Sequence, residues 1–216
     1  MPSLQLGNNP SSLPSLAKPA NSNGVFPNGQ YGELLDSKLL PDYYSLLKGG
    51  KVFGITGSGN PSAFTGGAAG TPLIGIWNGP NSGVDIVPIA LRVAIRTTGA
   101  AAVATDFNFW LAQQGSTAIT GTQTQARNQY SGVSTGSAAY CMVNTANTGA
   151  VASTLLLPSL SIGLTAATAV TNVGQFHDEL KGLGIVAPGN YLAWGASVAT
   201  TTATFDFALL WAEIPV

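Results

Sequence analysis

Runs of alternating apolar and polar residues, separated by turn-forming clusters, constrain the fold of this chain more than any other feature. In the run Ile89–Arg96 the large apolar residues and the small or charged residues fall on opposite faces of an extended chain. A period of two residues is typical of a β-strand with one buried face. The cluster Asn78–Gly83, NGPNSG, precedes this run and has the composition of a turn between two strands. The pattern therefore predicts strand, turn and strand.

The same pattern recurs from Lys51 to the end of the chain. The candidate strands are Val52–Thr56, Leu73–Trp77, Val84–Arg96, Thr105–Gln113, Ala118–Thr124, Ala138–Asn144, Val151–Leu157, Ser159–Leu164, Tyr191–Ala199 and Ala203–Ile214. Short strands with Gly-, Pro- and Asn-rich turns and almost no helix are typical of a sandwich or a closed barrel. We therefore expect an all-β domain over residues 41–216.

Two short helices are expected beside the strands. The segment Pro41–Lys48 opens with proline and aspartate, which suit a first helical turn, and is followed by two glycines that suit a stop. In the segment Asn172–Gly184, Phe176, Leu180 and Leu183 recur at the helical spacing i, i+4 and i+7 ahead of the terminal glycine. This spacing predicts a helix inserted in a loop.

Residues 1–40 differ in composition from the rest of the chain. They are rich in Pro, Asn, Ser and Gly, with apolar residues at irregular spacing, so they lack the means to build a core of their own. We expect an extended N-terminal arm that lies across a partner, and an unstructured tail is the alternative. The candidate assembly contacts, taken from the arm and the first helix, are Leu13, Leu16, Phe26, Tyr31, Tyr43 and Tyr44.

The surface of the domain is expected to be nearly uncharged. Charged residues make up 8% of the chain and the formal net charge is −1, whereas about 25% charged residues is usual. A dispersed monomer normally keeps interspersed charge on its surface. The composition therefore favours a protein packed against other subunits, with a secreted β-domain as the alternative. The eight basic residues are scattered, which is not the pattern of a nucleic-acid binding surface.

Cysteine content and hydropathy bear on whether the chain forms disulfides, carries a secretory signal or spans a membrane. Cys141 is the single cysteine, so no disulfide framework is possible within the chain, and its apolar surroundings predict a buried thiol. The first residues, MPSLQLGNNPSS, lack the basic and apolar regions of a secretory signal. The uncharged stretch Val151–Val170 is interrupted by Pro158, Gly163 and many hydroxyl residues, so we do not expect it to span a membrane.

Three patterns were weighed as signs of catalysis or cofactor binding. The segment GVSTG, Gly132–Gly136, matches the nucleophile elbow of hydrolases, but no acidic residue lies between Ser134 and His177, the single histidine. The adjacent residues His177–Glu179 would point about 100° apart on a helix, which favours a solvated face over a metal site. Gly57 and Gly59 do not complete a phosphate-binding fingerprint and are interpreted as turn residues. We therefore expect no enzyme and no cofactor.

The aromatic residues favour packing over ligand binding. Phe107 and Phe109 would share one strand face, with Trp110 on the other, and the closing strand carries Phe205, Phe207 and Trp211 on one face. Core or subunit packing is commoner for such residues than sugar binding. A glycosidase pair formed by Asp106 and Asp206 is a remaining alternative.

Three segments together resemble a known class of proteins. They are YGELLDSKLLPDYYSLLKGGKVF, followed by a Gly/Ala/Thr-rich loop, then TPLIGIWNGPNSGVDIVPIALRVAI, and the closing FALLWAEIPV. In this layout the chain resembles small β-rich structural proteins of tailed-phage virions, in particular head decoration (cement) proteins.

The resemblance implies a jelly-roll-like sandwich or barrel that forms trimers on a capsid lattice, with an arm that reaches its neighbours. The implied partners are further copies of the chain and the major capsid protein of a phage, with no nucleic acid and no membrane. The implied location is the virion, after assembly in the host cytoplasm. A trimeric tail-fibre or spike head that binds a host receptor or glycan is the alternative, although residues 1–40 show neither heptads nor β-helix repeats for a stalk.

Overall fold

The part of the chain that can be described consists mainly of residues 43–216. The computed structural model describes residues 43–66, 70–97, 103–132, 136–147, 150, 152, 154–164, 175–180, 184–200 and 203–216. Contacts between residues divide the chain into two units, Met1–Tyr44 and Ser45–Val216. Within the ranges given, no helix has the length and apolar character needed to cross a membrane.

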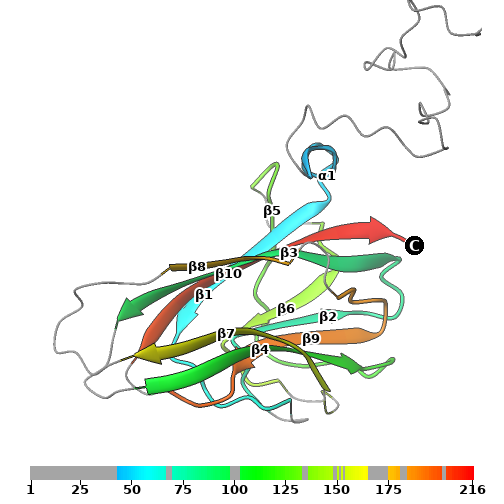
Figure 1. The fold of residues 1–216 in the computed structure, drawn as a ribbon. Coiled ribbons are helices and arrows are strands. Elements are labelled where there is room, and N and C mark those ends of the chain that lie inside the picture. Colours follow the sequence, from blue (N-terminus) through cyan, green and yellow to red (C-terminus); the bar gives the residue numbers. More distant parts are fainter. Residues whose placement is uncertain are drawn as a thin grey trace, which may run out of the picture. The chain divides into compact units, whose positions relative to one another are not determined.

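Ten strands in the described residues form two five-stranded antiparallel sheets that pack face to face (Figure 1). The first sheet has the order β5-β1-β10-β3-β8, with β5 at Arg127–Asn128, β1 at Val52–Gly59, β10 at Thr204–Pro215, β3 at Val84–Thr97 and β8 at Gln175–Glu179. The second has the order β6-β2-β9-β4-β7, with β6 at Ala139–Val143, β2 at Ile74–Asn78, β9 at Asn190–Ala196, β4 at Val103–Gln113 and β7 at Thr154–Leu164. The predicted all-β sandwich is therefore confirmed.

The strand order is that of a jelly roll. Strand β1 pairs with β10, β2 with β9, β3 with β8 and β4 with β7, so the chain runs out along four strands and returns antiparallel along four others. This long double ribbon is rolled up, because β10 also pairs with β3 and β9 also pairs with β4. Eight strands in two sheets, joined in this way, make a double Greek key. The short strands β5 and β6 add one edge to each sheet.

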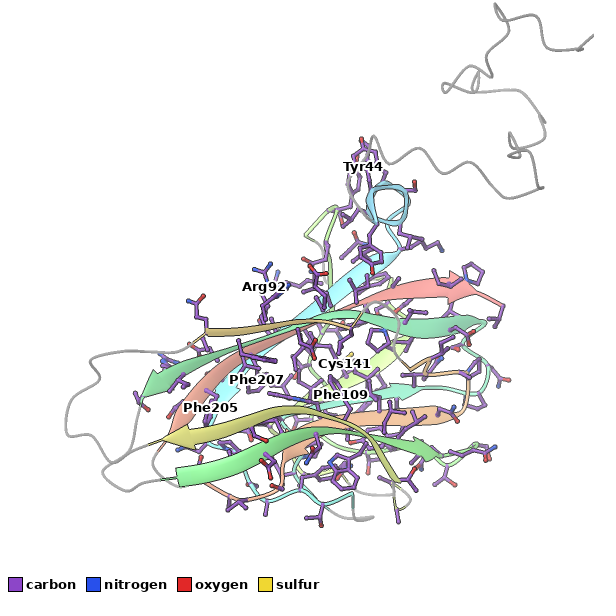
Figure 2. All side chains as sticks on the ribbon, viewed as in Figure 1. Tyr44, Arg92, Phe109, Cys141, Phe205 and Phe207 are labelled. Atoms are coloured by element: carbon purple, nitrogen blue, oxygen red, sulfur yellow. The ribbon has the colours of Figure 1, made fainter. Side chains whose placement is uncertain are left out.

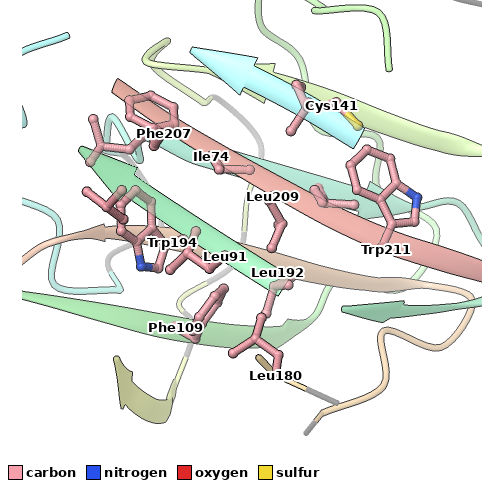
Figure 3. Close-up of a cluster of buried hydrophobic side chains, with 14 of the residues drawn as sticks. Ile74, Leu91, Phe109, Cys141, Leu180, Leu192, Trp194, Phe207, Leu209 and Trp211 are labelled. Carbon is pink, nitrogen blue, oxygen red and sulfur yellow. The ribbon is translucent and has the colours of Figure 1, made fainter. Parts of the chain in front are cut away.

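The core lies between the two sheets and is built by the alternation that the sequence predicts. In β3, Leu91 and Val93 are buried while Arg92 between them is exposed. Figure 3 shows inward side chains of the two sheets packed together, among them Leu91 and Leu209 from the first sheet and Trp194 from the second. The rings of Phe107 and Phe205 meet across the sandwich at 5.2 Å in an edge-to-face arrangement. Burial of these large apolar side chains is the main stabilising term of the fold.

The one helix in the described residues, α1, spans Tyr44–Lys48. It was predicted over residues 41–48, of which 41 and 42 lie outside the described residues. Leu46 and Leu47 pack against Val52 and Ala212, on the side of the first sheet that faces away from the core. The helix therefore covers one end of that sheet.

The predicted helix around Phe176 is wrong, because residues 175–179 form strand β8. Positions four apart share a face in a strand as well as in a helix, so the spacing of Phe176 and Leu180 fits both periods. The burial pattern has the strand period, with Gln175 and Glu179 exposed. Pairing with β3 supplies the backbone hydrogen bonds, so tertiary context decides between the two structures.

The predicted strand boundaries also need correction near Pro158 and near Ile119. The two strands expected on either side of Pro158 are one strand, β7, in which Pro158 lies opposite Asn108 beside a shift in register. Proline is tolerated there because β7 is an edge strand. The strand predicted over Ala118–Thr124 is absent from the described residues, where this segment forms only isolated bridges and Ile119 is buried.

Gly57 and Gly59 lie inside β1, contrary to the prediction that they are turn residues. A Cβ atom at Gly57 would overlap the Val143 side chain and lie 2.8 Å from a ring carbon of Phe207. A Cβ atom at Gly59 would overlap the Asn144 side chain. These glycines are therefore required by close packing between β1 and the second sheet, rather than by backbone conformation.

Gly57→Ala is expected to lower the free energy of unfolding by about 1–3 kcal/mol, because an added methyl group in a packed core forces its neighbours to move. Urea unfolding followed by tryptophan fluorescence measures the change. Gly79→Ala is the matched control, since a Cβ atom there meets nothing within 4 Å. The packing explanation fails if both variants are as stable as the natural chain.

Candidate interaction surface

The predicted assembly contacts are only partly within the described residues. Leu13, Leu16, Phe26 and Tyr31 lie outside them. Tyr43 and Tyr44 are described, and their side chains are exposed. A role of these two tyrosines in assembly stays a prediction.

Asp106 and Asp206 do not form the carboxylate pair of a glycosidase. Phe107 follows Asp106 in the chain, and Phe205 precedes Asp206. The rings of these two phenylalanines meet between the sheets. Neighbouring residues of a strand point to opposite faces, so Asp106 and Asp206 lie on the two outer faces of the sandwich. The core separates the two carboxylates, and this alternative is wrong.

The other catalytic patterns are placed as follows. Ser134 lies outside the described residues. His177 and Glu179 share the outer face of β8, with Nε2 of the histidine 3.8 Å from Oε1 of the glutamate, and both side chains are largely exposed. Asp178 between them points to the opposite face. In the described ranges no three His, Cys, Asp or Glu side chains gather where they would hold a metal ion.

Cys141 is fully buried on β6, as its apolar surroundings predict. Burial, and to a smaller degree the carboxylate of Glu213, raises the pKa of the Cys141 thiol far above its ordinary value. The thiol therefore stays protonated at neutral pH and lacks the thiolate character of a nucleophile or metal ligand.

Loops cover part of the outer face of the second sheet. Phe64 and Ile119, both from loops, belong to a buried cluster on this side, against which Trp110 and Trp77 pack. Trp110 meets the Phe64 ring edge-to-face at 6.2 Å. The Nε1 atoms of Trp77 and Trp110 are buried and have no hydrogen-bond partner among the described residues. Packing, which the sequence favours for Trp110, is what is observed, and Trp211 is likewise buried in the core.

The outer face of the first sheet, away from the end covered by α1, is left open by the described residues over β1, β10, β3 and β8. The strand register places one row of side chains across it, in the order Thr56, Ala208, Arg92 and His177. The next row is Ser58, Asp206, Ala94 and Gln175. Figure 2 shows Arg92 projecting away from the sandwich, whereas Phe207 and Cys141 lie within it. We call this surface the open face.

Small residues in the rows leave two hollows in the open face, one on each side of Arg92. The first has a volume of about 950 Å³, and its lining includes Arg92, Ala94, His177 and Asp206. The second has a volume of about 610 Å³, and its lining includes Arg92, Gly54, Arg127 and Gln129. Arg92 lines both hollows and therefore stands between them.

The charges of the open face are mostly compensated, with one exception. Arg96 Nη1 lies 3.7 Å from Asp206 Oδ1, and Arg127 Nη1 donates a hydrogen bond of 3.4 Å to the carbonyl of Gly132. Arg92 has neither an ion pair nor a hydrogen bond with any residue that the structure describes. An unpaired guanidinium between two hollows is suited to bind a carboxylate or phosphate in a bidentate manner.

Sequence reasoning placed Arg92 on the polar face of its strand but did not single it out. The signal that identifies it is the size of its neighbours, because Ala90 and Ala94 stand two residues away on the same face. Alanine is depleted in strands, so two alanines on either side of a cation on one strand face are an unusual pattern. Comparison of the chain with protein-family models, with curated proteins and with solved structures found no match. Function is therefore inferred from the geometry of the chain itself.

Proposed function

We propose that this chain is a non-enzymatic structural protein of a virion, which oligomerises as a trimer and binds the capsid lattice to decorate and stabilise it. The observation that supports self-association most directly is the long uncharged edge strand β7. The jelly-roll topology is shared with viral capsid and lectin domains. This second support is an analogy between folds and is weaker than the edge strand.

Strand β7 leaves one side of its backbone open in the part of the chain that is described. It ends the second sheet and pairs there only with β4. Its eleven residues, TLLLPSLSIGL, include no charged side chain. Monomeric proteins commonly protect an edge of this length with charged residues, above all lysine, because unpaired backbone groups invite another strand. Pro158 has no backbone donor, and the backbone groups of β7 that face away from β4 have no partner strand among the described residues.

The other three edges are protected in the described structure. Strand β8 carries His177, Asp178 and Glu179, and β5 is two residues long. The edge of β6 is partly covered, since the Thr124 amide donates a hydrogen bond to the carbonyl of Cys141. The contrast supports β7 as the edge at which a second copy adds. The edge supports self-association in general; a trimer further requires β7 of each subunit to meet a different surface of the next subunit, because an edge that pairs with its own copy gives a two-fold dimer.

Ser161→Lys is expected to convert the oligomer to monomers, because a lysine on the edge strand blocks the approach of another chain. Ser161 lies in β7 opposite Asp106 and is exposed, so the substitution leaves the core unchanged. Light scattering after size exclusion gives the absolute mass, which for a trimer is three times the 21.9 kDa of the chain.

Ser116→Lys is the matched control, since Ser116 is exposed in the loop after β4. It should leave the mass unchanged. A natural chain that is monomeric at micromolar concentration contradicts self-association. An oligomer that persists in Ser161→Lys contradicts the placement of the interface at β7.

The position in the virion requires a separate experiment. Antibodies raised against the chain should label the heads of the phage whose genome encodes it, as seen in immunoelectron micrographs. Labelling confined to the tail tip overturns the decoration function and favours the receptor-binding fibre.

A further inference from the structure

The open face of the first sheet is centred on Arg92. Arg92 has Ala208 beside it on β10 and His177 beside it on β8. Along its own strand the neighbours on the same face are alanines. The guanidinium therefore stands above a floor of small side chains, with room for a ligand group on both sides.

The two hollows make the surface elongated across the strands. Both hollows lie over β1, β10 and β3, displaced from each other along the strands, and together they reach from Gln175 and His177 on β8 to Arg127 on β5. Five strands at a spacing of about 4.8 Å span roughly 19 Å. An extended peptide of about six residues covers this distance at about 3.3 Å per residue. The dimensions therefore fit a short extended segment of a protein.

The charges of the surface select an acidic segment. Among the described residues, Arg92 has neither an ion pair nor a hydrogen bond, while Asp206 is held by Arg96 and Glu179 lies near His177. A carboxylate placed over Arg92 gains charge-assisted hydrogen bonds without displacing an existing partner of that arginine.

The floor of the surface favours a peptide over an acidic sugar. Protein sites for sugars commonly offer an exposed aromatic face, and the two phenylalanine rings that line the hollows are those of Phe176, which is half-buried, and Phe207, which is buried. Small residues such as Ala94 and Ala208 instead permit close approach of a peptide backbone. We propose that the open face binds an extended acidic segment of a partner protein, one carboxylate of which pairs with Arg92.

The test uses a fluorescein-labelled hexaglutamate peptide as the probe, titrated with the full chain at low ionic strength and followed by fluorescence anisotropy. Salt screens surface charges least under these conditions. Arg92→Gln is expected to weaken binding about tenfold, the loss of one charge-assisted contact. Arg92→Lys is expected to weaken it less, because lysine keeps the charge but not the bidentate geometry. Lys51→Gln is the matched control, since Lys51 is exposed and lines neither hollow.

Each outcome decides the proposal. Binding that Arg92→Gln weakens and Lys51→Gln leaves unchanged supports it. No binding of hexaglutamate, or equal loss in both variants, overturns it. Tighter binding of an oligogalacturonate with six carboxylates, lost in Arg92→Gln, overturns the peptide in favour of an acidic sugar. Thermal unfolding of Arg92→Gln should match that of the natural chain, because the residue is exposed.

This experiment is independent of the proposed function. It measures binding of a peptide to the open face, whereas the proposed function is tested by the mass of the oligomer and by its place in the virion. Ser161→Lys, which alters the opposite sheet, should bind hexaglutamate as the natural chain does.

Discussion

Glu213→Ala is expected to lower the free energy of unfolding by about 2–4 kcal/mol. Glu213 is a buried carboxylate, with 3% of the residue exposed. It accepts hydrogen bonds from Ser137 Oγ at 2.6 Å, from the Ala138 amide at 3.0 Å and from Trp211 Nε1 at 3.3 Å. Alanine leaves these donors without an acceptor and opens a cavity, and these losses exceed the relief of the carboxylate's desolvation. Guanidinium unfolding at neutral pH measures the difference.

Two further variants separate the possible causes. Glu213→Leu restores the lost volume but accepts no hydrogen bond, so it should remain strongly destabilised. Glu213→Gln keeps one acceptor oxygen and should fall between alanine and the natural chain. Because Ser137 and Ala138 lead into β6, hydrogen exchange at the first residues of that strand should accelerate in all three variants. If Glu213→Leu equals the natural chain in stability, cavity formation alone accounts for the loss in Glu213→Ala.

Trp194→Ala is expected to cost about 3–5 kcal/mol, the range for deleting a large buried aromatic side chain. Trp194 on β9 is fully buried. Its ring stacks on Phe107 at 5.0 Å and approaches Phe207 of the first sheet at 5.7 Å. Its loss therefore opens a cavity between the two sheets. Thermal and denaturant unfolding, followed by far-ultraviolet circular dichroism, measures the effect.

Trp110→Phe serves as the comparison for Trp194→Ala. Trp110 is half-buried, and its indole Nε1 is buried without a partner among the described residues. Phenylalanine removes this unsatisfied donor, so the variant should lie within about 1 kcal/mol of the natural chain. Equal losses in the two variants would falsify the assignment of the dominant core to the space between the sheets.

The individual strands were predictable wherever one face of the strand is buried and the other is exposed to solvent. Strands β3, β4 and β10 lie within two residues of their predicted bounds, because their inward residues alternate with exposed or small ones. Cys141 is buried, as its apolar surroundings predict, and Trp211, for which core or subunit packing was favoured, lies in the core. In such segments the local pattern and the global fold require the same side chains on the same face.

Predictions from the sequence failed where the spacing of apolar residues fits a helix and a strand equally well. They also failed where packing against the opposite sheet determines the local structure. The spacing of Phe176 and Leu180 suits helix and strand alike, and the edge of β3 determines the outcome. Gly57 was interpreted as a turn residue, since the close approach of Val143 and Phe207 is invisible along the sequence. Pro158 suggested that one strand ends and another begins at this residue. Because β7 is an edge strand, it accommodates the proline without a break.

The all-β class, most strands, the buried thiol and the low content of charged residues all follow from the sequence, because each depends on local periodicity or on composition. The rolling of the strands into a double Greek key follows only from the pairing of distant strands. This pairing also places Ala208, Arg92 and His177, far apart in the chain, in one row on an open face. Strand order depends on pairing between distant segments, whose backbone hydrogen bonds are the same for any partner. Side-chain packing across the sandwich selects among these pairings, and it exists only once the sheets have met.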